Sequence, residues 1–162
     1  MQKEEILSQV RTFLRTEGLL LPAKPVKEFY AQVFKLAGFG IGGLLTLSGR
    51  KAGEMGARMV KEMSEKERFS YEEVCLYAEA FLKETRVARL ELYEIKDGKV
   101  EMSFLSTVFA EAIGKSRKPV CLPVAGALGG FFTEMLGERW DCREVSCRAR
   151  GDERCSFLLQ RR

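Results

Sequence analysis

The stretch Trp140–Leu159, WDCREVSCRARGDERCSFLL, combines a strand pattern with three of the five cysteines of the chain. Apolar and polar residues alternate before Gly151, and a run of residues with high β-propensity follows it. The stretch therefore predicts a β-hairpin. Cys147 and Cys155 lie symmetrically about Gly151, so a hairpin centred there brings the two thiols side by side on one face.

The pairing of Cys147 with Cys155 has three interpretations. A cross-strand disulfide is geometrically possible, but it needs an oxidising compartment. Two inert buried thiols are a second interpretation, because free cysteine is among the most buried residue types. Metal ligation is the third, and two thiolates would supply half of a tetrahedral zinc site. Cys142 has the opposite strand parity and points away from the pair unless a bulge intervenes.

A wider pattern surrounds this hairpin. It consists of Glu144-x-x-Cys147, Gly151-Asp152 and Cys155-x-Phe157, preceded by Pro119-Val120-Cys121, Gly126 and Gly130. This pattern resembles the 4-vinyl reductase domain family, and the resemblance covers most of the chain after about Pro25. The family takes its name from members linked to vinyl reduction in bacteriochlorophyll synthesis. It also includes aromatic-sensing input domains of transcription activators.

The resemblance implies a fold similar to subunits of the TRAPP vesicle-tethering complex and to haem nitric-oxide-binding domains. In zinc-bearing members the ligands are three cysteines and a carboxylate, which fall here on Cys121, Cys147, Cys155 and, as the nearest upstream match, Glu101. The resemblance also implies an apolar pocket and homodimers. Residues chosen here as candidates for lining that pocket are Phe39, Leu44, Phe131 and Phe132, all of which could equally be ordinary core residues.

The surroundings of the cysteines favour this metal site on independent grounds. Cys121 precedes a nearly all-apolar segment, 123–136, in which Pro123 suits the first turn of a helix and Gly137 its C-terminal end. The amide groups at a helix N-terminus stabilise a thiolate. Glu144 has the wrong strand parity to share a face with Cys147, so it ranks behind Glu101 as the fourth ligand.

The rest of the sequence predicts an α+β fold, with an antiparallel sheet of two hairpins and helices packed on one face. Ser70 and Glu73 have the spacing of a capping box, and Lys96-Asp97-Gly98 is a strong hairpin turn. Gly49, Gly53 and Gly56 share nearly one helix face, where close packing or a ligand would need them. The expected helices span 4–16, 26–36, 44–63, 71–83 and 109–113, and the expected strands of the first hairpin span 87–95 and 99–105.

Composition bounds the function. At 162 residues, with 46% hydrophobic and 31% charged residues, the chain is expected to form one domain, with a helix and linker over 1–24 and a 4-vinyl reductase-like domain over 25–162. It has no histidine, which excludes imidazole catalysis and imidazole ligands. The odd cysteine count and charged start indicate a cytoplasmic protein. A net charge of +4 with interspersed acids does not favour nucleic-acid or membrane binding.

From these observations we expect a small-molecule-binding or sensory domain for a hydrophobic or aromatic ligand, with a structural zinc site. The alternatives are a reductase-type enzyme that depends on an external cofactor and a subunit of a protein assembly. An enzyme is the less favoured of these, because the sequence carries no nicotinamide or flavin fingerprint. Few amide residues beside many charged ones also resemble the composition of thermophile proteins.

Overall fold

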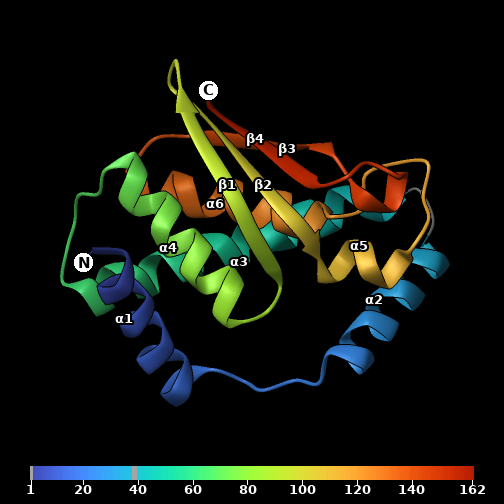
Figure 1. Ribbon diagram of the computed structural model, residues 1–162, viewed down its shortest axis with the longest axis horizontal. Helices are drawn as coiled ribbons and strands as arrows, with labels where there is room; N and C mark the ends of the chain where they lie inside the picture. The colour runs from blue at the N-terminus through green and yellow to red at the C-terminus, as the bar shows by residue number, and fades with distance from the viewer. Residues whose placement is uncertain (1, 38–39) are drawn as a thin grey trace.

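The structure is a computed structural model that describes residues 2–37 and 40–162. Its elements in chain order are α1 (Gln2–Glu17), α2 (Ala23–Ala37), α3 (Ile41–Ser64), α4 (Tyr71–Glu84), β1 (Ala88–Lys96), β2 (Lys99–Thr107), α5 (Val108–Ile113), α6 (Leu122–Leu136), β3 (Trp140–Ser146) and β4 (Cys155–Arg161). A short 3-10 helix, Arg148–Arg150, lies in the turn between β3 and β4. Figure 1 shows α1 and α2 at opposite ends of the molecule, joined by an extended loop.

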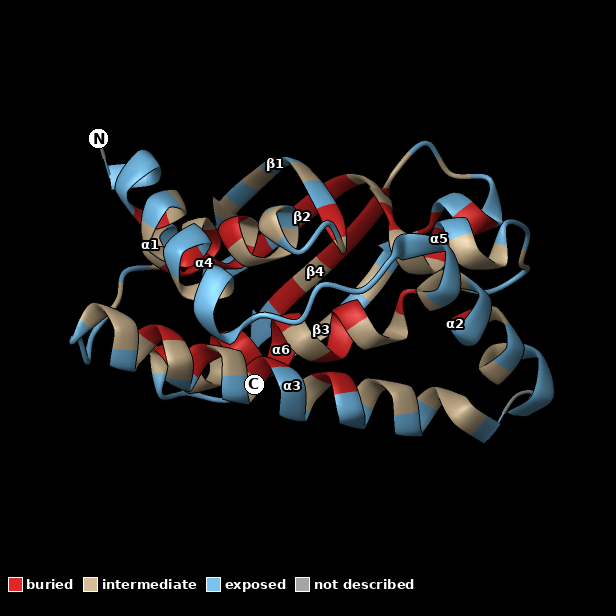
Figure 2. Ribbon diagram, turned by 90° about the horizontal axis from the view of Figure 1, so that it is seen from below, coloured by how far each residue is buried: buried red, intermediate tan, exposed pale blue. Residues whose placement is uncertain are grey.

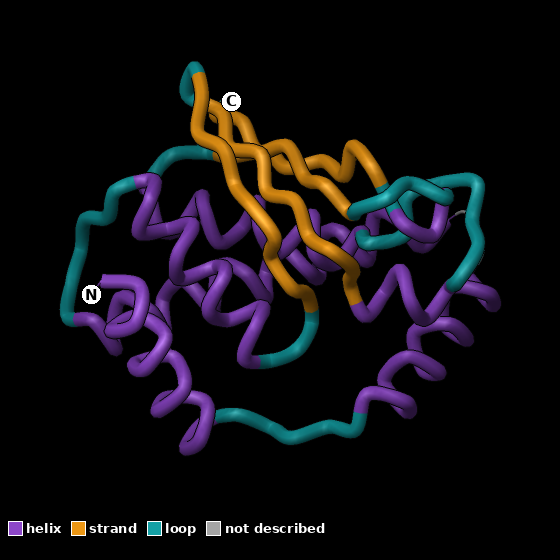
Figure 3. The backbone as a smooth tube through the Cα atoms, in the orientation of Figure 1, coloured by secondary structure: helices purple, strands orange, loops and turns teal. Residues whose placement is uncertain are grey.

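The four strands form one antiparallel sheet in the order β1-β2-β4-β3. Helices α3, α4 and α6 lie on one side of this sheet (Figures 1 and 3). On that side Met102, Phe104, Phe157 and Leu159 are fully buried, and β4 runs through the middle of the buried layer (Figure 2). The α+β fold with two hairpins and a helical layer, expected from the sequence, is confirmed.

Helices α3 and α6 pack against each other through glycines. A Cβ atom at Gly49 would lie 2.2 Å from the Pro123 carbonyl oxygen, and one at Gly53 would lie 2.0 Å from that of Ala127. Gly126 and Gly130 of α6 make equally close approaches to backbone oxygens of α3. Because the two backbones touch, any side chain at these positions would push the helices apart.

Local signals in the sequence formed as expected. The Ser70 side chain accepts the amide hydrogen of Glu73, and the Glu73 carboxylate accepts that of Ser70, which completes the capping box of α4. Asp97 and Gly98 both have positive φ, 51° and 69°, as a two-residue hairpin turn requires. Gly137 ends α6 in the left-handed conformation.

The N-terminal helices are attached at two separate places. Helix α1 packs on α4, where Arg11 forms an ion pair with Glu84 at 3.0 Å. Helix α2 packs on α5, where the rings of Tyr30 and Phe109 lie 4.6 Å apart. Between them the loop over 18–22 exposes apolar side chains to solvent. Among the described residues, no helix is both long and apolar enough to cross a membrane.

Candidate metal centre and apolar pocket

Three cysteines and one glutamate converge where α6 meets the β3–β4 hairpin. Cys121 is the residue before the first turn of α6, Cys147 follows β3, and Cys155 begins β4. The Sγ atom of Cys121 lies 3.9 Å from that of Cys147 and 3.9 Å from that of Cys155. With a carboxylate oxygen of Glu144, the ligand atoms all lie within 4.8 Å of one another. This arrangement could hold a metal ion.

A β-bulge explains how Glu144 reaches the cysteines. Glu144 pairs with Phe157, but Ser146 pairs with Ser156, so Val145 is an extra residue on β3. Side chains alternate between faces, and one inserted residue reverses the parity of everything beyond it. The bulge therefore turns Glu144 and Cys147 to the same face. It also moves the centre of pairing onto Gly151, which is the register that opposes Cys147 and Cys155.

Backbone and hydroxyl groups surround the sulfur and carboxylate atoms. The amide of Cys121 donates to Glu144 Oε2 at 2.9 Å, and the amide of Arg148 donates to Cys155 Sγ at 3.4 Å. The hydroxyl of Thr107 lies 3.0 Å from Cys121 Sγ. Thr107 also caps α5 by accepting the amide hydrogen of Ala110. These donors orient the ligand atoms, which is how surrounding residues support a metal centre.

The charges of the cluster are unbalanced within the protein. Burial, reinforced by the thiol of Cys147, raises the pKa of the Glu144 carboxyl to about 8. Hydrogen bonds from the Cys121 and Cys147 thiols lower the pKa of Cys155. Glu144 Oε1 is buried and has no hydrogen-bond partner. A buried carboxylate oxygen beside three thiols, aimed into the cluster without a donor, suits a cation.

The sulfur spacing also fits a tetrahedral metal. A Zn–S bond of about 2.3 Å in tetrahedral geometry places two sulfurs about 3.8 Å apart. The two Sγ–Sγ distances of 3.9 Å lie close to that value and far from the length of about 2.05 Å of a disulfide bond. All five cysteines are free thiols. The donor set is thus of the type that binds thiolate-preferring metals.

The structure places the predicted ligands as follows. It brings Cys121, Cys147 and Cys155 together, with Glu144 as the carboxylate beside them. Glu101 lies exposed on β2, opposite Leu158 of β4. It shares a face with Ser103, whereas Phe104, the partner of Cys155, faces the helices. The bulge that admits Glu144 has no strong signal in the sequence, so parity alone pointed to Glu101.

An apolar cavity of about 360 Å³ lies between α3, α4, α5 and α6. Only one of its lining side chains, that of Thr85, carries a polar atom. The lining residues are Gly49, Ala52, Gly53, Gly56, Ala78, Phe81, Leu82, Thr85, Val87, Phe109, Pro123, Val124, Ala127, Leu128 and Phe131. Ala52 and Thr85 are exposed, so the cavity opens to solvent beside them.

The predicted pocket residues take different positions. Phe131 lines the cavity. Phe132 is fully buried and packs on the ring of Trp140 at 5.6 Å, away from the cavity lining. Leu44 lies on the outer side of α3, with 61% of its surface exposed. Phe39 falls outside the described residues. Adjacent residues of a helix point in different directions, so Phe131 and Phe132 cannot both face one cavity.

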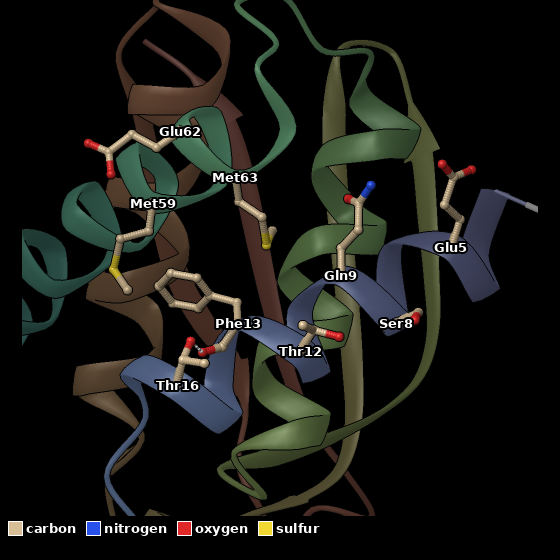
Figure 4. A pocket seen from close by; sticks show the side chains of 9 residues that line it. All are labelled: Glu5, Ser8, Gln9, Thr12, Phe13, Thr16, Met59, Glu62 and Met63. Carbon is tan, nitrogen blue, oxygen red and sulfur yellow. Dashed lines mark hydrogen bonds between the residues drawn. The ribbon is translucent and has the colours of Figure 1, made fainter.

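A larger groove of about 680 Å³ runs between α1 and α3. Figure 4 shows Phe13 of α1 close to Met59 and Met63 of α3, with polar side chains along the rest of the groove. Glu5 and Glu62 are among those polar side chains. The smaller cavity is therefore the one suited to an apolar molecule, because burying charged groups against such a molecule is costly.

The cavity and the metal-ligand cluster share the start of α6. Pro123 and Val124 line the cavity two and three residues after Cys121. On the other side, Tyr30 of α2 donates to the Val120 carbonyl at 2.6 Å. Burial, together with the nearby Cys121 and Glu144, raises the pKa of Tyr30. Helix α2, the cluster and the cavity thus meet at residues 120–124.

Comparison with known proteins agrees with this architecture. Residues 100–161 match the family model of the 4-vinyl reductase domain, which confirms the resemblance seen in the sequence. The transcriptional regulatory protein XylR of Pseudomonas putida is 25% identical over 96% of this chain and 30% of its own length. The chain thus spans about a third of that curated relative.

Three solved structures share the fold. The phenol-responsive sensory domain of the transcription activator PoxR has a TM-score of 0.71 at 19% identity, covering 88% of this chain and 76% of its own. A vinyl-4-reductase family protein from Methanocaldococcus jannaschii has a TM-score of 0.62 at 20% identity, covering 98% and 94%. A trafficking protein particle complex subunit 3 from Naegleria fowleri, covalently bound to palmitic acid, has a TM-score of 0.67 at 13% identity, covering 86% and 95%.

Proposed function

We propose that this chain, whose residues 100–161 match the 4-vinyl reductase domain, is a sensory module that binds a hydrophobic or aromatic small molecule. One observation carries the proposal: the helical layer holds a cavity of about 360 Å³ whose lining is apolar except for Thr85. Cavities of this size with few polar groups are typical of small-molecule sites. The proposal assigns a binding role and no reaction.

The names of the similar proteins support a sensory role. The PoxR domain is described as phenol-responsive and was solved with phenol, and XylR is a transcriptional regulator. The Naegleria subunit holds palmitic acid. The fold therefore accommodates both an aromatic and an aliphatic guest. We propose that this chain, like the first two, reports the presence of its guest to another part of a longer protein or to a partner.

We propose further that Cys121, Glu144, Cys147 and Cys155 hold a structural zinc ion. Three thiolates and a carboxylate fill a tetrahedral site and leave no open position for a substrate, which suits a structural role. When bound, the metal would supply the positive charge that Glu144 and the thiols lack. It would tie the β3–β4 hairpin to the start of α6, and binding would be coupled to local folding.

The shared start of α6 offers a route from guest to surface. A molecule in the cavity would contact Pro123 and Val124, and these residues follow Cys121 directly in the same helix turn. Tyr30 connects the same segment to α2. We propose that occupancy of the cavity is sensed through this segment as a change in how firmly α2 is held.

Other properties remain part of the proposal. We place the protein in the cytoplasm, because five free thiols suit a reducing compartment. We propose that residues 1–162 form one domain and that the domain is a homodimer without nucleic-acid or membrane partners. Exposed apolar side chains on α2 and on the loop before it support the dimer.

A thermal-shift experiment tests the binding function. Purified protein is extracted with organic solvent for mass spectrometry, and the stripped protein is melted with benzene, m-xylene, phenol or octane. A molecule that binds only the folded state raises the melting midpoint. We expect at least one apolar compound at saturation to raise it by several degrees. The absence of both a co-purified molecule and any shift would reject the binding function.

A further inference from the structure

We propose that Gly56 sets the usable volume of the cavity and that its buried guest carries no hydrogen-bonding group in the part that enters. This inference rests on the proposed binding function and specifies its ligand class. Gly56 is the third glycine on the inner face of α3, one turn beyond Gly53. The first two glycines and the third serve different purposes.

Packing against α6 requires Gly49 and Gly53 but does not require Gly56. A Cβ atom at either of the first two would lie within 2.2 Å of a carbonyl oxygen of α6. At Gly56 the nearest atom to such a Cβ would be Phe131 Cδ2 at 3.9 Å, which is an ordinary van der Waals contact. A glycine inside a long helix lowers its stability relative to alanine. The position therefore carries a cost that helix packing does not explain.

The missing side chain leaves space inside the cavity. Gly56 lines it beside Phe131 and opposite the α4 residues Phe81 and Leu82. An apolar cavity of about 150 Å³ is large enough for benzene, so the volume of about 360 Å³ admits a substituted ring or a short chain. A bulkier residue at position 56 would occupy part of that volume without touching the contact between α3 and α6.

The lining offers a guest almost no hydrogen-bonding partner. Among its side chains, only Thr85 has a polar atom, and that residue is exposed at the opening. Its hydroxyl donates to the Phe81 carbonyl at 2.6 Å, and its amide donates to the same carbonyl at 3.0 Å. A guest can therefore keep one polar group at the opening beside Thr85. A second polar group at the far end of the molecule would be buried without a partner.

Three probes of nearly equal shape separate these possibilities. m-Xylene, m-cresol and resorcinol replace the two methyl groups of one ring by hydroxyl groups, one at a time. Their dissociation constants are measured by calorimetric titration of the full chain. We expect m-cresol to bind no more than a few-fold differently from m-xylene, and resorcinol to bind at least about tenfold more weakly, because one hydroxyl must lose its hydrogen bonds.

Variants at position 56 test the role of the glycine. Gly56→Ala and Gly56→Leu should raise the melting midpoint of the guest-free protein, because both residues favour helix, and should weaken m-xylene binding, the leucine variant by about tenfold or more. Gly43→Ala and Gly43→Leu are matched controls. Gly43 lies on the same helix with nothing within 4 Å of its Cβ position, so these variants should bind m-xylene like the wild type.

Each outcome has a defined meaning. Resorcinol binding as tightly as m-xylene would overturn the ligand class, and unchanged m-xylene binding by a folded Gly56→Leu protein would overturn the role of Gly56. If the leucine variant does not fold, Gly56→Ala decides, since one methyl group is tolerated at 3.9 Å from Phe131. Wild-type protein that binds none of the three probes, and shows no shift with octane, would reject the proposed binding function itself.

Discussion

At the scale of single residues, the fourth ligand of the cysteine cluster depends on one inserted residue. Val145 is the extra residue in β3, and it turns the Glu144 carboxylate toward Cys121 and Cys147. Without it, Glu144 would lie on the outer face of the sheet with Glu101. The bulge is local, but it decides which of two carboxylates can complete a tetrahedral set of ligands.

The first prediction therefore compares Glu144→Gln with Glu101→Gln. The wild type should contain about one zinc per chain by elemental analysis after dialysis. Glu144→Gln should lose zinc to a competing chelator at least about tenfold more readily, because substitutions around a metal commonly cost about 10- to 100-fold in affinity. Glu101→Gln should behave like the wild type. Zinc lost from Glu101→Gln and retained by Glu144→Gln would contradict the assignment.

Cysteine variants and pH extend this test. Cys121→Ser, Cys147→Ser and Cys155→Ser should each lower zinc content and the melting midpoint, whereas Cys75→Ser and Cys142→Ser should keep the zinc. The pKa of the Glu144 carboxyl is about 8 in the metal-free protein, so metal binding below that pH must displace its proton. Apparent zinc affinity should consequently rise as pH increases toward about 8, with a shallower rise in Glu144→Gln.

At the scale of elements, two tyrosines attach the two N-terminal helices. Tyr30 of α2 donates to the Val120 carbonyl at 2.6 Å, and Tyr77 of α4 donates to Gln9 of α1 at 3.0 Å. The first contact lies beside the cysteine cluster and the second lies far from it. The helices should therefore respond independently to the loss of either hydroxyl.

The second prediction uses this pair as matched variants. Tyr30→Phe leaves the Val120 carbonyl without its partner, at a cost of about 1 kcal/mol, and should speed hydrogen exchange in α2 but not in α1. Tyr77→Phe should speed exchange in α1 but not in α2. Exchange measured by mass spectrometry on peptides from 2–17 and 23–37 distinguishes them. Equal effects of both variants on both helices would mean that α1 and α2 open as one unit.

At the scale of the whole molecule, apolar side chains on the N-terminal segment face solvent. Leu19 and Leu20 in the loop have 90% and 98% of their surface exposed, and Phe29 and Leu36 of α2 have 72% and 83%. Exposed apolar groups gathered on adjoining segments mark interaction surfaces. A second copy of the chain is the occupant that the family resemblance implies.

The third prediction concerns this surface. The wild type should have the mass of a dimer by light scattering, and the double variant Leu20→Glu, Phe29→Glu should be a folded monomer, because two buried carboxylates oppose association. Leu92→Glu is the control: Leu92 is an exposed apolar residue of β1 at 45%, and its variant should stay dimeric. A monomeric wild type, or a control that also dissociates, would remove the assignment of this surface.

Signals between near neighbours in the sequence were sufficient to predict most elements. The capping box at Ser70 and Glu73, the turn at Asp97 and Gly98, and the end of α6 at Gly137 each involve residues within a few positions of one another. Their energies are set by the local backbone, so the elements form where the pattern predicts. The approach of Cys147 to Cys155 belongs to the same class, because it follows from a turn centred on Gly151.

Only the tertiary structure decided which residues complete the two candidate sites. The extra residue Val145 is defined by pairing with β4, and it selects Glu144 over Glu101. Gly49, Gly53 and Gly56 look alike in the sequence, yet α6 meets the first two and leaves space at the third. Register and cavity volume depend on which backbones meet across the fold, and no local pattern encodes that meeting. The sequence by itself therefore determined the elements and three of the ligands, and long-range packing decided the fourth ligand and the pocket.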